Sequence, residues 1–243
     1  SLGTSGTVYA HADEPIIDAD GEIAAFCSST GGWLPLLCTM NCTVATELMR
    51  DLLGADLEAF EQQIGSAPRG SGGVLTLPFF NGERTPNLPH ARGCIVGLDS
   101  GNTRPENLLR SAVEGATFAL KAGIDKLGTL GVAAEDIVVT GGGSKSPAWR
   151  QIVADICNLP VTVYRQGEGA AFGAALQALH VIEPGADIAD IVDAHLTRDE
   201  ARCCEPRPAA VGDYADAYRG YRAAVEAVTP LYSHASQETR QKP

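Results

Sequence analysis

The segment from Ile137 to Ile156 constrains the fold of this chain most, because a short β-branched run passes through three glycines into a helix. Residues 137–140 have the composition of a buried strand. Ser146 is the expected N-cap of the helix, and Pro147 its first residue. Apolar residues at helical spacing then define one buried face of this helix: Trp149, Ile152, Val153 and Ile156.

The glycines between strand and helix suggest a place for a ligand. Gly141, Gly142 and Gly143 have no Cβ, so a flat ring or a phosphate could approach the backbone there. The free N–H groups of the first helical turn favour anions, and Lys145 adds a positive charge. In the Walker phosphate-binding loop the lysine follows a glycine, whereas Lys145 follows Ser144. The third glycine of the dinucleotide-binding fingerprint is also absent. The spacing therefore excludes both of these loops. A tight connection without a ligand stays the alternative interpretation.

Composition limits the class of protein. A chain of 243 residues with 44% hydrophobic and 20% charged residues is expected to form one large α/β domain or two small ones. The net charge of −12 argues against nucleic acid or membrane partners, although a local cationic phosphate pocket stays possible. No apolar run approaches the roughly 20 residues that span a bilayer, and no secretory signal pattern is present. We expect a soluble, cytoplasmic protein.

The seven cysteines are scattered and contain no CxxC pair, which predicts reduced side chains and no metal site. Further strands are expected at 23–27, 74–79, 94–98 and 161–164, and further helices at 41–53, 105–127, 168–181, 187–194 and 214–232. The helix at 105–127 should be central to the core. Glu168 would either complement the dipole of its helix or serve a functional site. The last dozen residues are predicted to be disordered.

The segment from Asn81 to Pro86 places Glu83 and Arg84 in a run of turn residues after an apolar strand. Its simplest interpretation is a surface turn whose ion pair contributes little to stability. The chain also opens in a turn rich in glycine and hydroxyl residues that leads into a strand. A domain seldom opens inside a hairpin, so we expect this chain to be the second part of a longer protein.

Taken in order, these segments resemble the FGGY family of carbohydrate kinases over roughly residues 1–230. The matching strings are SLGTSGT from Ser1, LPFFNGERTPNLPHARGCIVGL from Leu77, AVEGATFAL within helix 105–127, TGGGSKSPAWRQIVADICNLPV from Thr140 and EGAAFGAALQA from Glu168. Several motifs in one order are more specific than a glycine triplet alone, and they favour the nucleotide-binding interpretation of that loop.

The resemblance implies an α/β fold of the actin-like ATPase (ribonuclease H-like) type, with a mixed sheet flanked by helices. Family members have two domains that close over a cleft. Residues 1–232 resemble the C-terminal, ATP-binding domain, with a tail at 233–243, whereas an N-terminal sugar-binding domain is not represented. The sequence leaves the oligomeric state open, with a homodimer as one alternative.

The resemblance also implies the nucleotide contacts. Gly3 and Thr4 would lie in the turn that contacts the β- and γ-phosphates, which suits a short hydroxyl donor and exposed amides. Asn41 and Thr43, at a helix start, would flank the nucleotide from the other side. The adenosine is expected to lie against Gly142, Gly143, Ser144 and Ser146.

Family members transfer the γ-phosphoryl group of ATP to a sugar hydroxyl with an aspartate base and Mg²⁺. The resemblance favours a ketopentose, D-xylulose, as acceptor, giving xylulose 5-phosphate; glycerol, gluconate, ribulose and rhamnulose are alternatives. The base is expected upstream of Ser1, and neither Asp13 nor Asp18 is placed to replace it. This polypeptide alone should therefore show no turnover in a sugar phosphorylation assay. A non-catalytic nucleotide-binding module of the same fold is the alternative of a different class.

Overall fold

The computed structural model describes residues 1–167, 169–183 and 185–238. The helices are α1 (Thr43–Leu52), α2 (Leu57–Ser66), α3 (Pro105–Thr129), α4 (Pro147–Cys157), α5 (Gly169–Ile182), α6 (Ile188–His195) and α7 (Pro208–Glu238). The strands are β1 (Gly6–Tyr9), β2 (Ala24–Cys27), β3 (Trp33–Thr39), β4 (Leu75–Leu77), β5 (Cys94–Val96), β6 (Ile137–Val138) and β7 (Val161–Thr162). Short 3₁₀ helices are η1 (Arg69–Gly73), η2 (Gly142–Lys145) and η3 (Glu200–Arg202). The predicted α/β class is confirmed.

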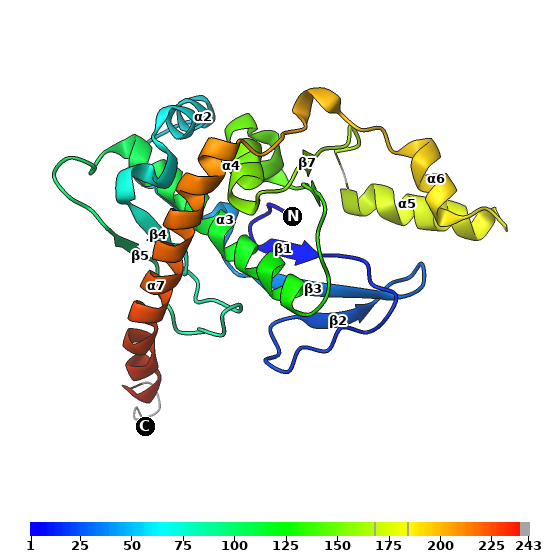
Figure 1. Cartoon of the computed structure of the whole chain (residues 1–243), viewed down its shortest axis with the longest axis horizontal. Helices are drawn as coiled ribbons and strands as arrows, with labels where there is room; N and C mark the ends of the chain where they lie inside the picture. The colour runs from blue at the N-terminus through cyan, green and yellow to red at the C-terminus, as the bar shows by residue number, and fades with distance from the viewer. Residues whose placement is uncertain (168, 184, 239–243) are drawn as a thin grey trace.

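The strands form small separate sheets within the described ranges. An antiparallel sheet has the order β1-β3-β2, β4 pairs antiparallel with β5, and β6 pairs parallel with β7. The single mixed sheet that the resemblance implied is therefore divided here. Figure 1 shows the three-stranded sheet and the β6–β7 pair on opposite sides of the N-terminal residue.

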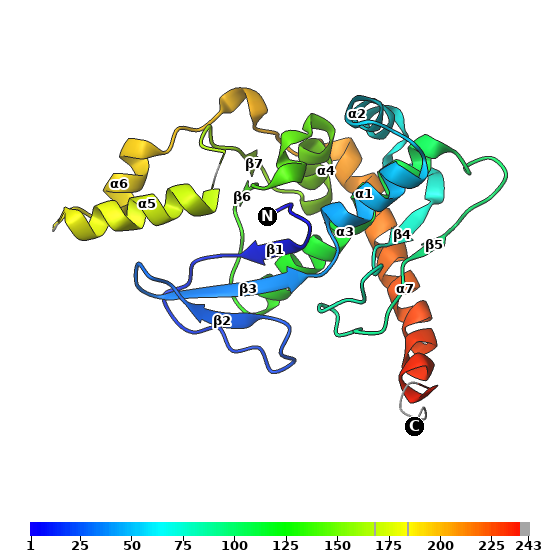
Figure 2. The same ribbon diagram turned by 180° about the vertical axis from the view of Figure 1, so that it is seen from behind.

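Helix α3 is the centre of the core, as predicted. Every residue from Leu109 to Leu120 is buried, and the helix contacts α1, α2, α4, β1 and β4. Figures 1 and 2 show α3 running through the middle of the molecule, with α7 beside it. Phe118 of α3 packs against three tyrosines of α7, Tyr214, Tyr218 and Tyr221. The helix predicted at 214–232 is confirmed, although α7 begins earlier and ends later than predicted.

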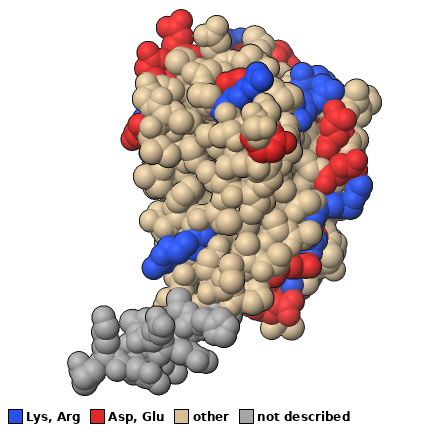
Figure 3. Space-filling model, turned by 90° about the vertical axis from the view of Figure 1, so that its left-hand side faces the viewer, with Lys and Arg blue, Asp and Glu red and all other residues tan. Residues whose placement is uncertain are grey.

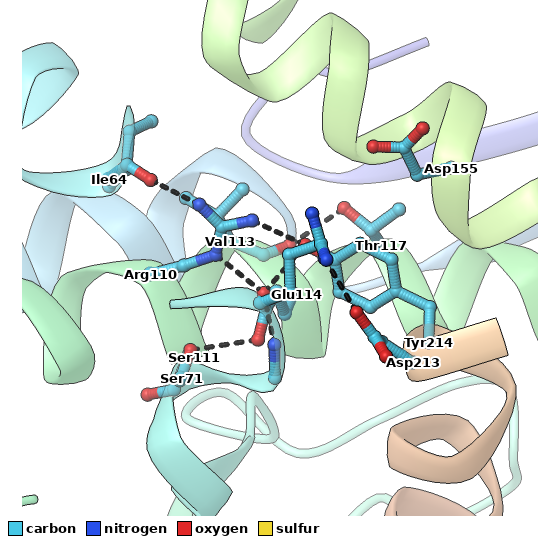
Figure 4. Close-up of polar contacts among 12 residues, drawn as sticks. Ile64, Ser71, Arg110, Ser111, Val113, Glu114, Thr117, Asp155, Asp213 and Tyr214 are labelled. Carbon is cyan, nitrogen blue, oxygen red and sulfur yellow. Dashed lines mark hydrogen bonds and ion pairs between the residues drawn. The ribbon is translucent and has the colours of Figure 1, made fainter. Parts of the chain in front are cut away.

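A buried polar network joins α3 to its neighbours (Figure 4). Arg110 donates from Nε to Glu114 Oε1 at 2.7 Å and from Nη1 to the carbonyl of Ile64 in α2 at 2.6 Å. Glu114 also accepts from Ser71 Oγ at 2.8 Å and from Tyr214 Oη at 2.8 Å. Burial raises the pKa of Glu114, and the positive charge of Arg110 opposes this shift. The network thereby ties α2, η1 and α7 to the central helix.

Two elements were not predicted by the local patterns. Strand β3 contains Pro35, and a proline inside a run argues against a central strand. The proline still accepts a hydrogen bond from the N–H of Ala10 through its carbonyl. Helix α2 begins at the N-cap Asp56, whose side chain accepts from the N–H of Ala59 at 2.8 Å. This cap followed by Glu58 in the first turn was a usable sequence signal.

All seven cysteines are free, and two of them, Cys42 and Cys157, are buried. In the part of the chain that the structure describes, no helix is long and apolar enough to cross a membrane. Figure 3 shows the side of the molecule that lies at the left in Figure 1. Lys and Arg side chains alternate with Asp and Glu around the margin of this face, so neither sign of charge forms a continuous patch there.

Candidate functional site

A cleft of about 320 Å³ lies between α1, α2 and the start of α4. Its lining residues are Thr43, Thr46, Glu47 and Arg50 of α1, Leu57, Phe60 and Glu61 of α2, and Gly142, Gly143, Lys145, Ser146, Pro147 and Trp149 of the glycine loop and α4. Leu57 is an apolar side chain with 70% of its surface exposed. An exposed leucine beside a buried phenylalanine suits a flat apolar ring, while Arg50 and Lys145 suit an anionic ligand.

The glycines of the loop have different roles. A Cβ at Gly142 would have no atom within 4 Å, so this residue leaves open space on the cleft side. A Cβ at Gly143 would lie 2.9 Å from Leu2 Cβ and 2.9 Å from Trp149 Cζ3. Gly141 has a φ of 88°, which favours glycine. Gly142 therefore gives a ligand access to the backbone, whereas Gly143 lets the loop pack against Trp149 and Leu2.

The N-terminal end of α4 already binds a carboxylate from another part of the chain. Glu61 of α2 accepts hydrogen bonds from the hydroxyl of Ser146 and, at 2.7 Å, from the N–H of Ala148. Ser146 is also the N-cap, as predicted, and accepts from the N–H of Trp149 at 3.0 Å. The helix N-terminus that the glycine pattern suggested as an anion site is thus neutralised by Glu61. Ser146 lines the cleft, but its hydroxyl is committed to these two bonds.

Ser144 lies inside the loop and does not line the cleft. Its hydroxyl donates to the carbonyl of Gly141 at 2.7 Å, and its own carbonyl accepts from Arg150 at 2.8 Å and Arg202 at 3.2 Å. These bonds close the 3₁₀ turn and attach it to α4. The structure supports a role for Ser144 in the shape of the loop.

The N-terminal turn connects the two sides of the site. The carbonyl of Gly3 accepts from the N–H of Thr43 at 2.8 Å, and that of Thr4 accepts from the N–H of Cys42 at 3.0 Å. On the other side, the N–H of Gly143 donates to the carbonyl of Leu2 at 3.0 Å. The N-terminal turn thus joins segments that are far apart in the sequence, the start of α1 and the glycine loop.

Asn41 is placed differently from these residues. It is fully buried, and its amide nitrogen donates to the carbonyl of Gly82 at 2.7 Å and to Glu83 Oε2 at 3.1 Å. Its side-chain oxygen accepts from the N–H of Asn81 at 3.1 Å. Asn41 therefore faces the 81–86 segment and does not line the cleft.

The interpretation of this segment as a surface turn with a Glu83–Arg84 pair is wrong. Glu83 is only 2% exposed and accepts from the N–H groups of Met40 at 2.6 Å and Arg84 at 2.7 Å. Burial raises the pKa of Glu83, and these hydrogen bonds oppose the shift. The Arg84 side chain is exposed instead. Glu83 thereby binds the short connection between the end of β3 at Thr39 and the start of α1.

Sequence reasoning missed the α2 contribution to the site, which comprises Leu57, Phe60 and Glu61. Glu168 lies outside the described residues. Within the described ranges, no group of three His, Cys, Asp or Glu side chains is placed to hold a metal ion.

Comparison with known proteins agrees with this architecture. The family model described as "FGGY family of carbohydrate kinases, C-terminal domain" matches residues 1–182. The xylulose kinase of Haemophilus influenzae is 42% identical over 221 residues, which cover 91% of this chain and 45% of that protein. The chain therefore spans less than half the length of this curated relative.

Solved structures show the same relationship. The crystal structure of xylulose kinase from Bifidobacterium adolescentis superposes with a TM-score of 0.74 at 35% identity, covering 89% of this chain and 42% of that chain. Gluconate kinase from Lactobacillus acidophilus superposes with a TM-score of 0.87 at 24% identity, covering 96% and 47%, and shows the fold alone. The actin-like ATPase fold is thereby confirmed, and the chain belongs to the FGGY family of carbohydrate kinases.

Proposed function

We propose that this chain is the ATP-binding half of a sugar kinase, which transfers the γ-phosphoryl group of ATP to a hydroxyl of a ketopentose. D-xylulose is the proposed acceptor, giving xylulose 5-phosphate. The observation that carries the proposal is the cleft beside Gly142, which lies next to the turn formed by Gly3 and Thr4. The relatives named xylulose kinase support the choice of acceptor.

The proposed position of ATP follows from the side chains of the cleft. The adenine ring would contact Leu57 and Phe60, close to the open backbone at Gly142. The phosphate tail would extend toward Gly3 and Thr4, where an exposed threonine and backbone amides can donate hydrogen bonds. Arg50 and Lys145 would supply positive charge locally, in a chain whose net charge is −12.

The residues of this chain would bind and orient ATP, whereas the groups that act on the sugar would lie outside this chain. Phosphoryl transfer needs a group that accepts the hydroxyl proton and Mg²⁺ that neutralises the phosphates. Two carboxylates near the site, the partly buried Glu61 and the buried Glu83, are held by hydrogen bonds from backbone N–H groups. No acidic cluster among the described residues fits a metal ion, so Mg²⁺ would be held mainly by the phosphates of ATP. We propose that the base and the sugar contacts come from the other half of the kinase.

Substitutions at the neighbouring glycines test the position of the nucleotide. In Gly142→Val, a side chain enters open cleft space, so we expect ATP and ADP affinity to fall at least about tenfold, which corresponds to about 1.4 kcal/mol. The melting temperature should stay near that of the unmodified chain. Isothermal titration with each nucleotide measures the affinities.

Two control variants separate binding from packing. Gly143→Ala places a Cβ against Trp149 and Leu2, so it should lower the melting temperature as well as binding. Lys145→Ala should weaken binding by about 1 kcal/mol or less, because a solvent-exposed charge is screened. Equal ATP affinity in Gly142→Val and the unmodified chain, or no binding by the latter, would contradict the assigned cleft.

A further inference from the structure

The part of the cleft assigned to the base of the nucleotide is lined by groups that offer contact area. Leu57 and Phe60 of α2 are apolar side chains, and Pro147 begins α4 on the same cleft. Proline has no backbone N–H to donate, and Gly142 has no side chain. A Cβ at Gly142 would have no atom within 4 Å, so the cleft also has free space beside the loop. These residues can pack against a flat ring of variable outline.

Several polar side chains on the walls are already hydrogen-bonded within the chain. Thr46 Oγ1 donates to the carbonyl of Thr43 at 2.9 Å. Glu61 accepts from the hydroxyl of Ser146 and from a backbone N–H in the first turn of α4. Trp149 donates from Nε1 to a threonine hydroxyl of α3 at 3.0 Å. A base that bonded to one of these groups would replace an existing hydrogen bond, so the net gain in binding would be small.

The backbone of the glycine loop is occupied in the same way. The N–H of Gly143 donates to the carbonyl of Leu2 at 3.0 Å, and its carbonyl accepts from the N–H of Ser146 at 3.1 Å. The carbonyl of Lys145 accepts from Arg150 Nη1 at 3.1 Å. These bonds hold the loop to the body of the protein. The loop therefore presents a shape to the base, with these polar groups turned to partners inside the chain.

The charged side chains of the cleft do not separate one purine from another. Glu47 of α1 is exposed, so water competes for its oxygens and a hydrogen bond to a base adds little. A carboxylate also accepts equally well from the amino group of adenine and from the N–H groups of guanine. Arg50, which pairs with Asp51 at 3.1 Å, and Lys145 are cations that favour the phosphates.

We propose that the cleft binds purine nucleoside triphosphates as a class, without distinguishing ATP from GTP or ITP, which deepens the proposed function and rests on it. A site built to hydrogen-bond a polar group strongly rejects an analogue that lacks it, because the buried partner is left unpaired. An apolar site does not strongly reject a ligand that differs in its polar edge. The walls at Leu57, Phe60 and Gly142 are of the second kind. The size of the base and the phosphate tail would determine the affinity.

Isothermal titration of the chain with ATP, GTP, ITP and UTP tests this selectivity. The dissociation constants of the three purine nucleotides should agree within about tenfold, which corresponds to about 1.4 kcal/mol. UTP should bind more weakly than any of them, because its single ring covers less of the apolar wall.

The possible failures are distinguishable. A preference for ATP over GTP or ITP of more than about tenfold would overturn the inference and leave the proposed ATP site standing. Affinity for UTP equal to that for ATP would show that the base does not lie against the apolar wall, and would overturn it as well. Binding of none of the four nucleotides would contradict the proposed function itself and the inference with it.

Two variants examine the walls separately. Leu57→Ala should weaken ATP, GTP and ITP by the same factor, about threefold to tenfold, because it removes apolar contact that all three share. Leu57 is 70% exposed, so the melting temperature should stay near that of the unmodified chain. Glu47→Ala removes an exposed acceptor and should leave the ratio of ATP to GTP affinity unchanged. A change of this ratio in either variant would show that a side chain reads the base, and would overturn the inference.

Discussion

Replacing Arg110 with methionine should lower the free energy of unfolding by about 3–5 kcal/mol, because it leaves a buried carboxylate without its partner. Arg110 and Glu114 are 4% and 1% exposed, and their side chains meet at 2.7 Å. Arg110 also donates to Ile64 and to Tyr214, so the substitution removes the bond that ties α2 to α3. Denaturant unfolding followed by circular dichroism measures the loss.

The pH dependence of this variant adds an independent check. Burial already raises the pKa of Glu114, and loss of the arginine should raise it further. A carboxyl whose pKa is higher in the folded state loses stabilisation as the pH rises from the unfolded pKa to the folded pKa. The Arg110→Met protein should therefore be less stable at pH 7 than at pH 5.

The matched control is the double variant Arg110→Met with Glu114→Leu, which removes both charges of this buried pair. Replacing both members of a buried pair with apolar groups is often neutral or stabilising, so much of the lost stability should return. If the single and double variants are equally unstable, the loss comes from packing, and the assigned role of the ion pair is wrong.

Gly115→Ala should lower the free energy of unfolding by about 3 kcal/mol, although alanine normally favours a helix. A Cβ at Gly115 would collide with the backbone carbonyl oxygen of Thr76 in β4, and a backbone atom cannot move aside as a flexible side chain can. The helix and the strand would have to separate. Thermal and denaturant unfolding measure the effect.

Gly128→Ala in the same helix is the control for this prediction. A Cβ at Gly128 would have no atom within 4 Å, so only helix propensity changes, and we expect stabilisation of up to about 1 kcal/mol. Similar effects of the two substitutions would show that α3 does not pack as closely against β4 as the structure has it.

The local patterns of the sequence predicted the elements whose signals are short in range. The buried face of α4, its N-cap Ser146 and the central helix α3 are each defined by residues within one or a few turns. The several motifs in family order also predicted the actin-like ATPase fold. Helix periodicity and motif order are properties of the chain itself, so one sequence is enough to identify them.

Other features depended on which segments meet. The anion at the start of α4 is Glu61, far away in the sequence, so the glycine loop pattern gave no sign that this position was taken. Asn41 donates to the buried Glu83, which lies about forty residues away in the sequence. Gly143 differs from Gly142 only because Trp149 and Leu2 lie on its side.

The sequence by itself therefore determined the fold class, the family, and the N-terminal turn and glycine loop that lie beside the cleft. Only the tertiary structure decided which polar atoms in those loops are free for a ligand and which are already bonded. The physical reason is that burial and hydrogen-bond satisfaction are set by long-range packing, in which residues of similar local character meet different neighbours.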